Sequence, residues 1–148
     1  MLSDTMLQQM NEQVKHEMAS AYLYLSMAAH FESVNLSGLA SWMRVQAGEE
    51  QEHALKFFDH ILDRGGKVSL QAIGQPPVDF TTPLAVFEKV LAHEQQVTAL
   101  IHKLYALAVQ EADYASQLFL AWFVTEQVEE EKNASTIVET LKLIGDKS

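Results

Sequence analysis

Apolar residues recur every three or four positions over four long stretches of this chain, which is typical of helices that bury one face. The first stretch runs from Ser3 or Asp4, either of which can cap a helix, to about residue 31. A glutamate falls on its inward face, where carboxylates are rarely found. The inward positions are Met10, Val14, Glu17, Ala21, Tyr24, Ala28 and Phe31.

The second stretch runs from about Gly38, with Ser37 as its cap, to Arg64, and the glycine pair that follows is a helix C-terminal signal. A short connection before it predicts that the first two helices are antiparallel neighbours. Gly48 inside this helix predicts close packing or a ligand there, because an interior glycine costs about 1 kcal/mol relative to alanine. The inward positions are Leu39, Met43, Ala47, Glu50, His53, Phe57 and Ile61.

Residues 67–82 contain a glycine and two prolines and have no helical period. We interpret this segment as an extended crossover that spans the length of a bundle, which would make the second and third helices parallel. The apolar residues that could hold it against the bundle are Val68, Leu70 and Ile73.

Thr82 and Pro83 predict the start of the third helix, because proline is favoured at the first helical position. Asp113 can cap a fourth helix that ends at Gly145. We therefore predict one domain over residues 1–148, an all-α four-helix bundle with one long crossover between helices two and three. The inward positions of the third helix are Phe87, Leu91, Glu94, Ile101, Tyr105 and Ala108, with Val97 or Thr98 between; those of the fourth are Leu120, Phe123, Gln127, Glu130, Ala134, Ile137, Leu141 and Ile144.

Charge and composition exclude several classes of protein. The net charge of -10 argues against nucleic acid or an anionic membrane as a partner, and no apolar run approaches the roughly 20 residues that span a bilayer. The absence of cysteine excludes disulfides, thiolate zinc sites and thiol catalysis. The first residues lack a basic stretch followed by an apolar run, so no signal peptide is expected and the cytoplasm is the expected location.

Each predicted helix places one acid on its inward face near the middle: Glu17, Glu50, Glu94 and Glu130. Two helices add a second possible ligand one turn away, His53 and Gln127. No lysine or arginine occupies the central part of these faces, so internal salt bridges cannot balance the carboxylates. Any one acid could be solvated if its helix were slightly rotated, but four at matching depth favour bound cations over accident.

Two divalent cations carry the charge that balances four carboxylates, which points to a dinuclear metal site. Oxygen ligands with one imidazole suit iron or manganese better than structural zinc. Ferritin-like di-iron bundles are the general example of such a site, with Glu from two helices and Glu-x-x-His from the other two. Here the second helix offers Glu50-x-x-His53, whereas the fourth offers Gln127-x-x-Glu130. Because only one metal position has a histidine, we expect the two metal affinities to differ.

At these positions the sequence resembles bacterial non-haem ferritin over about residues 2 to 145. The resemblance implies iron as the metal, with Glu17, Glu50 and His53 at one ion, Glu94 and Glu130 at the other, and Glu50 bridging them. The motifs that carry it are Asn11-Glu12-Gln13 with Glu17 and Tyr24, Glu49-Glu50-x-x-His53, Glu94-Gln95, and Trp122-x-x-x-Glu126-Gln127-x-Glu129-Glu130-Glu131-Lys132.

The resemblance implies further roles near this centre. Gln127 matches a glutamine beside the irons, and Tyr24 matches a tyrosine that can donate an electron. Glu49, Glu126 and Glu129 match the acids of a third iron site that shares Glu130. On chemistry alone, the acidic run around residues 126–131 could simply be solvated, and Tyr24 could be an ordinary core aromatic.

Two departures from related families change what we expect. Gln51 stands where bacterioferritin has its haem-ligating methionine, and no histidine follows Glu130 at the matching spacing, so no haem is expected. The sequence stops at Ser148, so the short C-terminal fifth helix that lines the fourfold axis of a ferritin shell is expected to be absent from this chain.

The resemblance implies iron storage with ferroxidase activity: Fe(II) is oxidised by dioxygen or peroxide within the subunit, and Fe(III) is stored as mineral inside a homo-oligomeric shell of about 24 subunits. The alternatives are an iron-binding protein without fast oxidase activity and a soluble diiron oxygenase or peroxidase. A rubrerythrin is disfavoured, because its rubredoxin module needs four cysteines and this chain has none.

Overall fold

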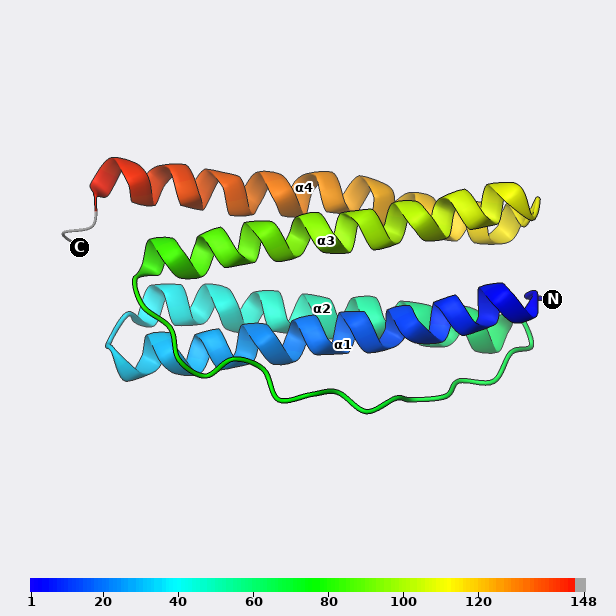
Figure 1. Ribbon diagram of the computed structural model, residues 1–148, viewed down its shortest axis with the longest axis horizontal. Coiled ribbons are helices and arrows are strands. Elements are labelled where there is room, and N and C mark those ends of the chain that lie inside the picture. Colours follow the sequence, from blue (N-terminus) through cyan, green and yellow to red (C-terminus); the bar gives the residue numbers. More distant parts are fainter. Residues whose placement is uncertain (146–148) are drawn as a thin grey trace. The chain divides into compact units, whose positions relative to one another are not determined.

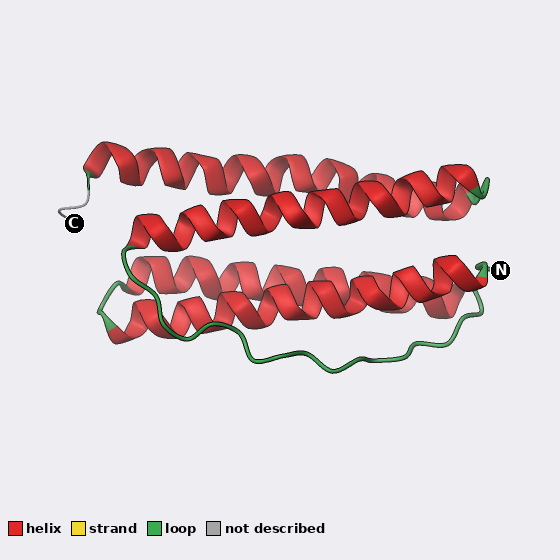
Figure 2. Ribbon diagram, in the orientation of Figure 1, coloured by secondary structure: helices red, strands yellow, loops and turns green. Residues whose placement is uncertain are grey.

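The computed structural model describes residues 1–145, which form four helices joined by loops (Figures 1 and 2). The described part contains no strand, as the sequence predicted, and none of its helices has an apolar stretch that would fit across a membrane. Residues 146–148, and with them the prediction about a fifth helix, lie outside the described residues. The helices are α1 (Asp4–Ser33), α2 (Ser37–Asp63), α3 (Pro83–Gln110) and α4 (Tyr114–Ile144).

Three of the four predicted helix starts are confirmed by their capping hydrogen bonds. The side chain of Ser3 accepts from the backbone N–H of Met6 at 3.0 Å. Thr82 caps α3 and Asp113 caps α4 through equivalent bonds of 3.1 Å. Such caps satisfy N–H groups that have no partner within the helix, so they define where each helix begins.

The predicted start of α2 is wrong by one residue. Ser37 is the first helical residue, and the N-cap is Leu36, whose side chain makes no capping bond. The reason lies in the tight connection from α1: Asn35 adopts a left-handed φ of 63°, and the N–H of Leu36 bonds back to the carbonyl of Phe31 at 2.9 Å. This turn places the Leu36 carbonyl where it accepts from Ala40 and begins the helix.

Contacts divide the chain into two units, each an antiparallel helix pair. The first unit, Met1–Phe80, holds α1, α2 and most of the linker that follows. The second unit begins at Thr81 and holds α3 and α4. Within each unit the short connection between the helices forces them to lie side by side (Figure 1).

The linker after α2 follows α1 along most of its length (Figure 1). Asn11 donates to the carbonyl of Lys67 at 3.0 Å and accepts from the N–H of Ser69 at 2.8 Å. Further along α1, Ser26 donates to the carbonyl of Pro77. At the end of α1, the rings of His30 and Phe80 lie 5.5 Å apart. The linker thus returns the chain to the end of the first unit where α2 begins, as a crossover must.

The predicted apolar anchors of this linker are only partly right. Val68 and Ile73 are half-buried, but Leu70 is 72% exposed. The polar side chain of Asn11 holds the linker instead, because it can serve one backbone donor and one acceptor of an irregular segment at once. A polar anchor of this kind cannot be predicted from the pattern of apolar residues.

The predicted inward faces of the first two helices are buried, except that Leu39 is half-buried. In the second unit, the buried residue is the neighbour of the predicted one at three places: Val90, Leu104 and Val138 are buried there. The predicted and the observed faces both advance in steps of three and four, and at each of these places the two candidate residues are neighbours near one edge of the face. The pattern alone does not decide which of two such neighbours points further inward. The predicted residues at these places, Leu91, Tyr105 and Ile137, are half-buried. Towards the end of α4, Leu141 is also half-buried and Ile144 is exposed.

Gly48 does not lie in a crowded or ligand-lined place, contrary to the expectation from the sequence. It is exposed, and a Cβ built on it would meet no atom within 4 Å. Gly48→Ala is therefore expected to raise the free energy of unfolding of the protein by about 1 kcal/mol, because alanine is the better helix former. Denaturant unfolding followed by circular dichroism measures the change.

Gly66→Ala is the control for this prediction. A Cβ at Gly66 would lie 2.7 Å from Leu7 Cδ1 and 3.2 Å from the carbonyl oxygen of Ile61, so this variant should be destabilised. If Gly48→Ala instead lowered the free energy of unfolding, position 48 would be in contact with something that the isolated chain does not contain.

Candidate metal centre

All four predicted acids are buried, one on each helix. Glu17, Glu50, Glu94 and Glu130 are at most 4% exposed, and so are His53 and Gln127. No lysine or arginine is buried within residues 1–145. Burying a carboxylate without a balancing charge is strongly unfavourable, so this part of the chain favours a bound cation or an added proton.

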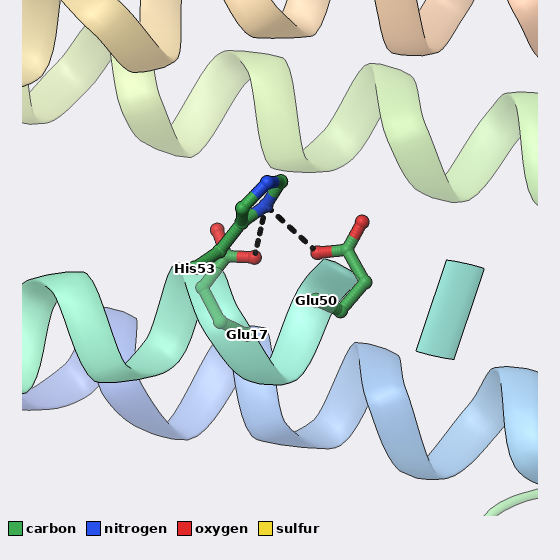
Figure 3. A group of neighbouring side chains, drawn as sticks. All are labelled: Glu17, Glu50 and His53. Carbon is green, nitrogen blue, oxygen red and sulfur yellow. Dashed lines mark ion pairs between the residues drawn. The ribbon is translucent and has the colours of Figure 1, made fainter. Parts of the chain in front are cut away.

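In the first unit, Glu17, Glu50 and His53 converge on one point (Figure 3). Glu17 comes from α1, whereas Glu50 and His53 lie one turn apart on α2. His53 Nδ1 lies 3.7 Å from Glu17 Oε2 and 3.5 Å from Glu50 Oε2. These three residues can present one ligand atom each, all within 4.8 Å of one another.

These distances fit a single metal ion. Two ligands bound at about 2.1 Å and at right-angled or tetrahedral geometry lie about 3.0 to 3.4 Å apart, so a contraction of a few tenths of an ångström would suffice. Glu17 Oε2 and Glu50 Oε2 are buried and accept no hydrogen bond. Two such oxygens beside an imidazole nitrogen form a ligand set that suits iron or manganese.

The other oxygen of each of these carboxylates is held by a glutamine. Gln13 Nε2 donates to Glu17 Oε1 at 3.0 Å, and Gln46 Nε2 donates to Glu50 Oε1 at 3.2 Å. Sequence reasoning did not assign a role to these two glutamines. The signal that could have found them is their spacing, because each glutamine stands four residues before its glutamate, on the same face of the same helix.

Burial and neighbouring charges shift the pKa values of Glu50 and His53. Burial raises the pKa of Glu50 to about 7, and the Glu17 carboxylate adds to this shift while His53 opposes it. Burial lowers the pKa of His53, but the carboxylates of Glu17 and Glu50 raise it more, to about 10. Without metal at neutral pH, His53 is therefore an imidazolium that partly balances the two acids.

In the second unit, Glu94 and Gln127 lie together in a polar network. Gln127 Nε2 donates to Glu94 Oε2 at 3.2 Å and to the hydroxyl of Thr98 at 3.1 Å. That hydroxyl donates to Glu131 Oε2 at 2.6 Å. Glu130 follows Gln127 by three residues, so both share the buried face of α4.

The positions of the remaining predicted residues do not test the roles that the resemblance implies for them. Tyr24 is fully buried on α1, two turns beyond Glu17. Glu49 is half-buried on α2 of the first unit, whereas Glu126 is half-buried and Glu129 is exposed on α4 of the second. Within either unit alone these acids form no third site, so that site stays a prediction.

Comparison with known proteins finds matches over almost the whole chain. Residues 7–144 match the family model described as a ferritin-like domain. A bacterial non-heme ferritin of Bacteroides fragilis is 44% identical over 99% of this chain and 92% of its own length. One from Staphylococcus aureus is 39% identical over the whole chain and 89% of its own. The solved open pore ferritin of the archaeon Archaeoglobus fulgidus is 50% identical, covers 99% of this chain and 90% of that one, and has a TM-score of 0.98. This likeness confirms the predicted fold class, the ferritin-like four-helix bundle.

The shifted pKa values predict that metal binding releases protons. At pH 8 the metal-free protein holds a proton on His53 but little on Glu50, so binding of one Co(II) in the first unit should release about one proton. At pH 6 Glu50 is protonated as well, so about two protons should be released. The apparent affinity for Co(II) should therefore rise with pH. Isothermal titration calorimetry in buffers of different ionisation enthalpy counts these protons.

Glu52→Ala serves as the control, because Glu52 is an exposed acid of the same helix and its loss should leave the proton count unchanged. Zero proton release at pH 8 would show that His53 does not exchange its proton for the metal.

Proposed function

This chain belongs to the ferritin family, and from that membership we propose that it stores iron and acts as a ferroxidase that oxidises Fe(II) with dioxygen. The observation that carries the proposal is the cluster of Glu17, Glu50 and His53, beside which no lysine or arginine of residues 1–145 is buried to balance the negative charge. Its donor atoms match the preference of Fe(II) for carboxylate oxygens together with an imidazole nitrogen.

We propose that two Fe(II) ions are the substrates of one site per chain, built by a single ferritin-like domain. Glu17, Glu50 and His53 would bind the first ion, Glu94 and Glu130 would bind the second, and Glu50 would bridge them. The burial of one acid on each helix supports this assignment, because two divalent cations balance four carboxylates. Gln127, which donates to Glu94, would hold that ligand in place and border the site of dioxygen.

The proposed reaction balances as follows. Two Fe(II) ions each give one electron to dioxygen, which takes up two protons and leaves as hydrogen peroxide, while both ions become Fe(III). Carboxylate ligands favour the ion of higher charge, so they promote oxidation. Peroxide can replace dioxygen as the two-electron acceptor, in which case it is reduced to two molecules of water.

Further parts of the proposal rest on the resemblance alone. Tyr24 would supply an additional electron, and Glu49, Glu126 and Glu129 would share a third iron with Glu130. The Fe(III) product would be stored as mineral in a cytoplasmic shell of about 24 identical chains. The names of the related proteins, non-heme ferritins, support the absence of haem from this scheme.

Loss of a ligand tests the proposed reaction. Glu50→Ala and His53→Ala are each expected to abolish the fast phase of Fe(II) oxidation, because each removes an atom that would bind the ion. Stopped-flow absorbance after mixing the Fe(II)-loaded protein with oxygenated buffer follows this phase, and circular dichroism checks that the helices persist.

Two surface variants control for loss of charge and loss of imidazole. Glu52→Ala and His102→Ala remove an exposed carboxylate and an exposed imidazole, and both should keep the fast phase. A fast phase that persisted in Glu50→Ala or His53→Ala would overturn the ligand assignment.

The assembly is tested separately. Sizing chromatography and electron micrographs should show a hollow particle of about 24 subunits. A monomer or dimer that still oxidised Fe(II) would favour the alternative, a soluble diiron oxygenase.

A further inference from the structure

Both carboxylates of the first unit receive the same kind of hydrogen bond in the same place. Gln13 holds Glu17 and Gln46 holds Glu50, in each case through Nε2 and in each case at Oε1. One pair lies on α1 and the other on α2, so the arrangement arises twice from two separate helices. Both glutamines are buried, which makes a chance surface contact an inadequate explanation.

In both bonds the glutamine is the donor, through its Nε2, and the carboxylate oxygen accepts. A contact of 3.0 or 3.2 Å is a normal length for such a bond. With Oε1 occupied, Oε2 is the oxygen that faces His53, at 3.7 Å from Glu17 and 3.5 Å from Glu50.

Because Oε1 and Oε2 belong to one planar carboxylate, a hydrogen bond that holds Oε1 also fixes the direction of Oε2. The last torsion of a glutamate side chain is broad and nearly twofold, so an unrestrained carboxylate can exchange its oxygens or turn both toward a metal. A hydrogen bond from a residue four positions earlier on the same rigid helix removes that freedom. Each carboxylate then presents one oxygen in a set direction before any metal arrives.

A donor without charge is well suited to orienting a carboxylate that is to bind a cation. A lysine or arginine at either position would also hold the carboxylate, but its positive charge would balance the acid and repel a cation. The amide of glutamine orients the carboxylate and leaves its charge available to the ion. This explains why the buried donors beside these two acids are amides in a chain that has lysine and arginine elsewhere.

We infer that Gln13 and Gln46 are positioning residues for metal binding: each uses its amide N–H to hold Oε1 of its glutamate, so that Oε2 is the oxygen presented to the divalent cation beside His53. The inference rests on the proposed function, because it takes the cluster of Glu17, Glu50 and His53 to be a metal site. Neither glutamine contacts the metal in this scheme, so both act through the glutamates.

The variants Gln13→Met and Gln46→Met test the inference, with Co(II) alone as the probe. Methionine is unbranched, forms helices well and fills a similar space, but it has no N–H to donate. Each variant is expected to bind Co(II) about tenfold more weakly than the parent protein, since loss of an outer partner of a metal ligand typically costs tenfold or more. The visible spectrum of bound Co(II), which depends on coordination number and geometry, should also change.

Gln117→Met is the matched control. Gln117 also donates its amide, to the carbonyl of Ala108 at 3.3 Å, but it lies in the second unit and contacts no acid of the proposed site. Its loss should leave both the affinity and the Co(II) spectrum unchanged. Thermal unfolding of each metal-free variant accompanies the titration, and Gln13→Leu and Gln46→Leu replace any methionine variant that does not fold.

The outcomes separate the inference from the proposed function. If the parent protein binds no Co(II) in this unit, the metal site is wrong and the inference falls with it. If the parent binds Co(II), and folded variants at positions 13 and 46 bind it with the same affinity and spectrum, only the inference is overturned. Weaker binding with an altered spectrum, absent from the Gln117 control, supports it, because a merely structural role would not change the coordination of the bound ion.

Discussion

The burial of negative charge beside an imidazole is the constraint on which the rest of this protein depends. Glu17 and Glu50 lie within 3.7 Å of His53 Nδ1, and no lysine or arginine is buried in residues 1–145 to neutralise them. A buried charge of this kind must be offset by a proton or by a metal ion. The raised pKa values of Glu50 and His53 correspond to compensation by protons: without metal, these two residues retain protons that a metal would displace.

The fold supplies the rigidity that such a cluster needs. Long helices with well-formed caps fix the positions of the acids, and the tight turn at residues 34–36 sets how α1 and α2 meet. The linker adds no ligand, but its attachment to Asn11, Ser26 and His30 binds it to the outside of α1. Because regular helices hold side chains more precisely than loops do, the helices can place these side chains without a bound ion.

Amide groups recur as the partners of the buried acids. In the first unit the amides of Gln13 and Gln46 come from the same helix as the glutamate that they hold. In the second unit the amide of Gln127 reaches Glu94 from the neighbouring helix. Both arrangements provide hydrogen bonds without supplying positive charge, so the acids remain able to attract a cation.

The sequence by itself determined the helices, most of their caps and the acids at their inward faces. These features depend on neighbours within one or two turns: a capping oxygen bonds an N–H three residues away, and burial follows the helical period. The resemblance to ferritins led to the proposal of iron and of its ligands. Only the tertiary structure decided which oxygen of Glu17 and Glu50 is held, that Asn11 fixes the linker, and that Gly48 faces open space. Those outcomes depend on side-chain torsions and on groups distant in the sequence, which the packing of the helices alone brings together.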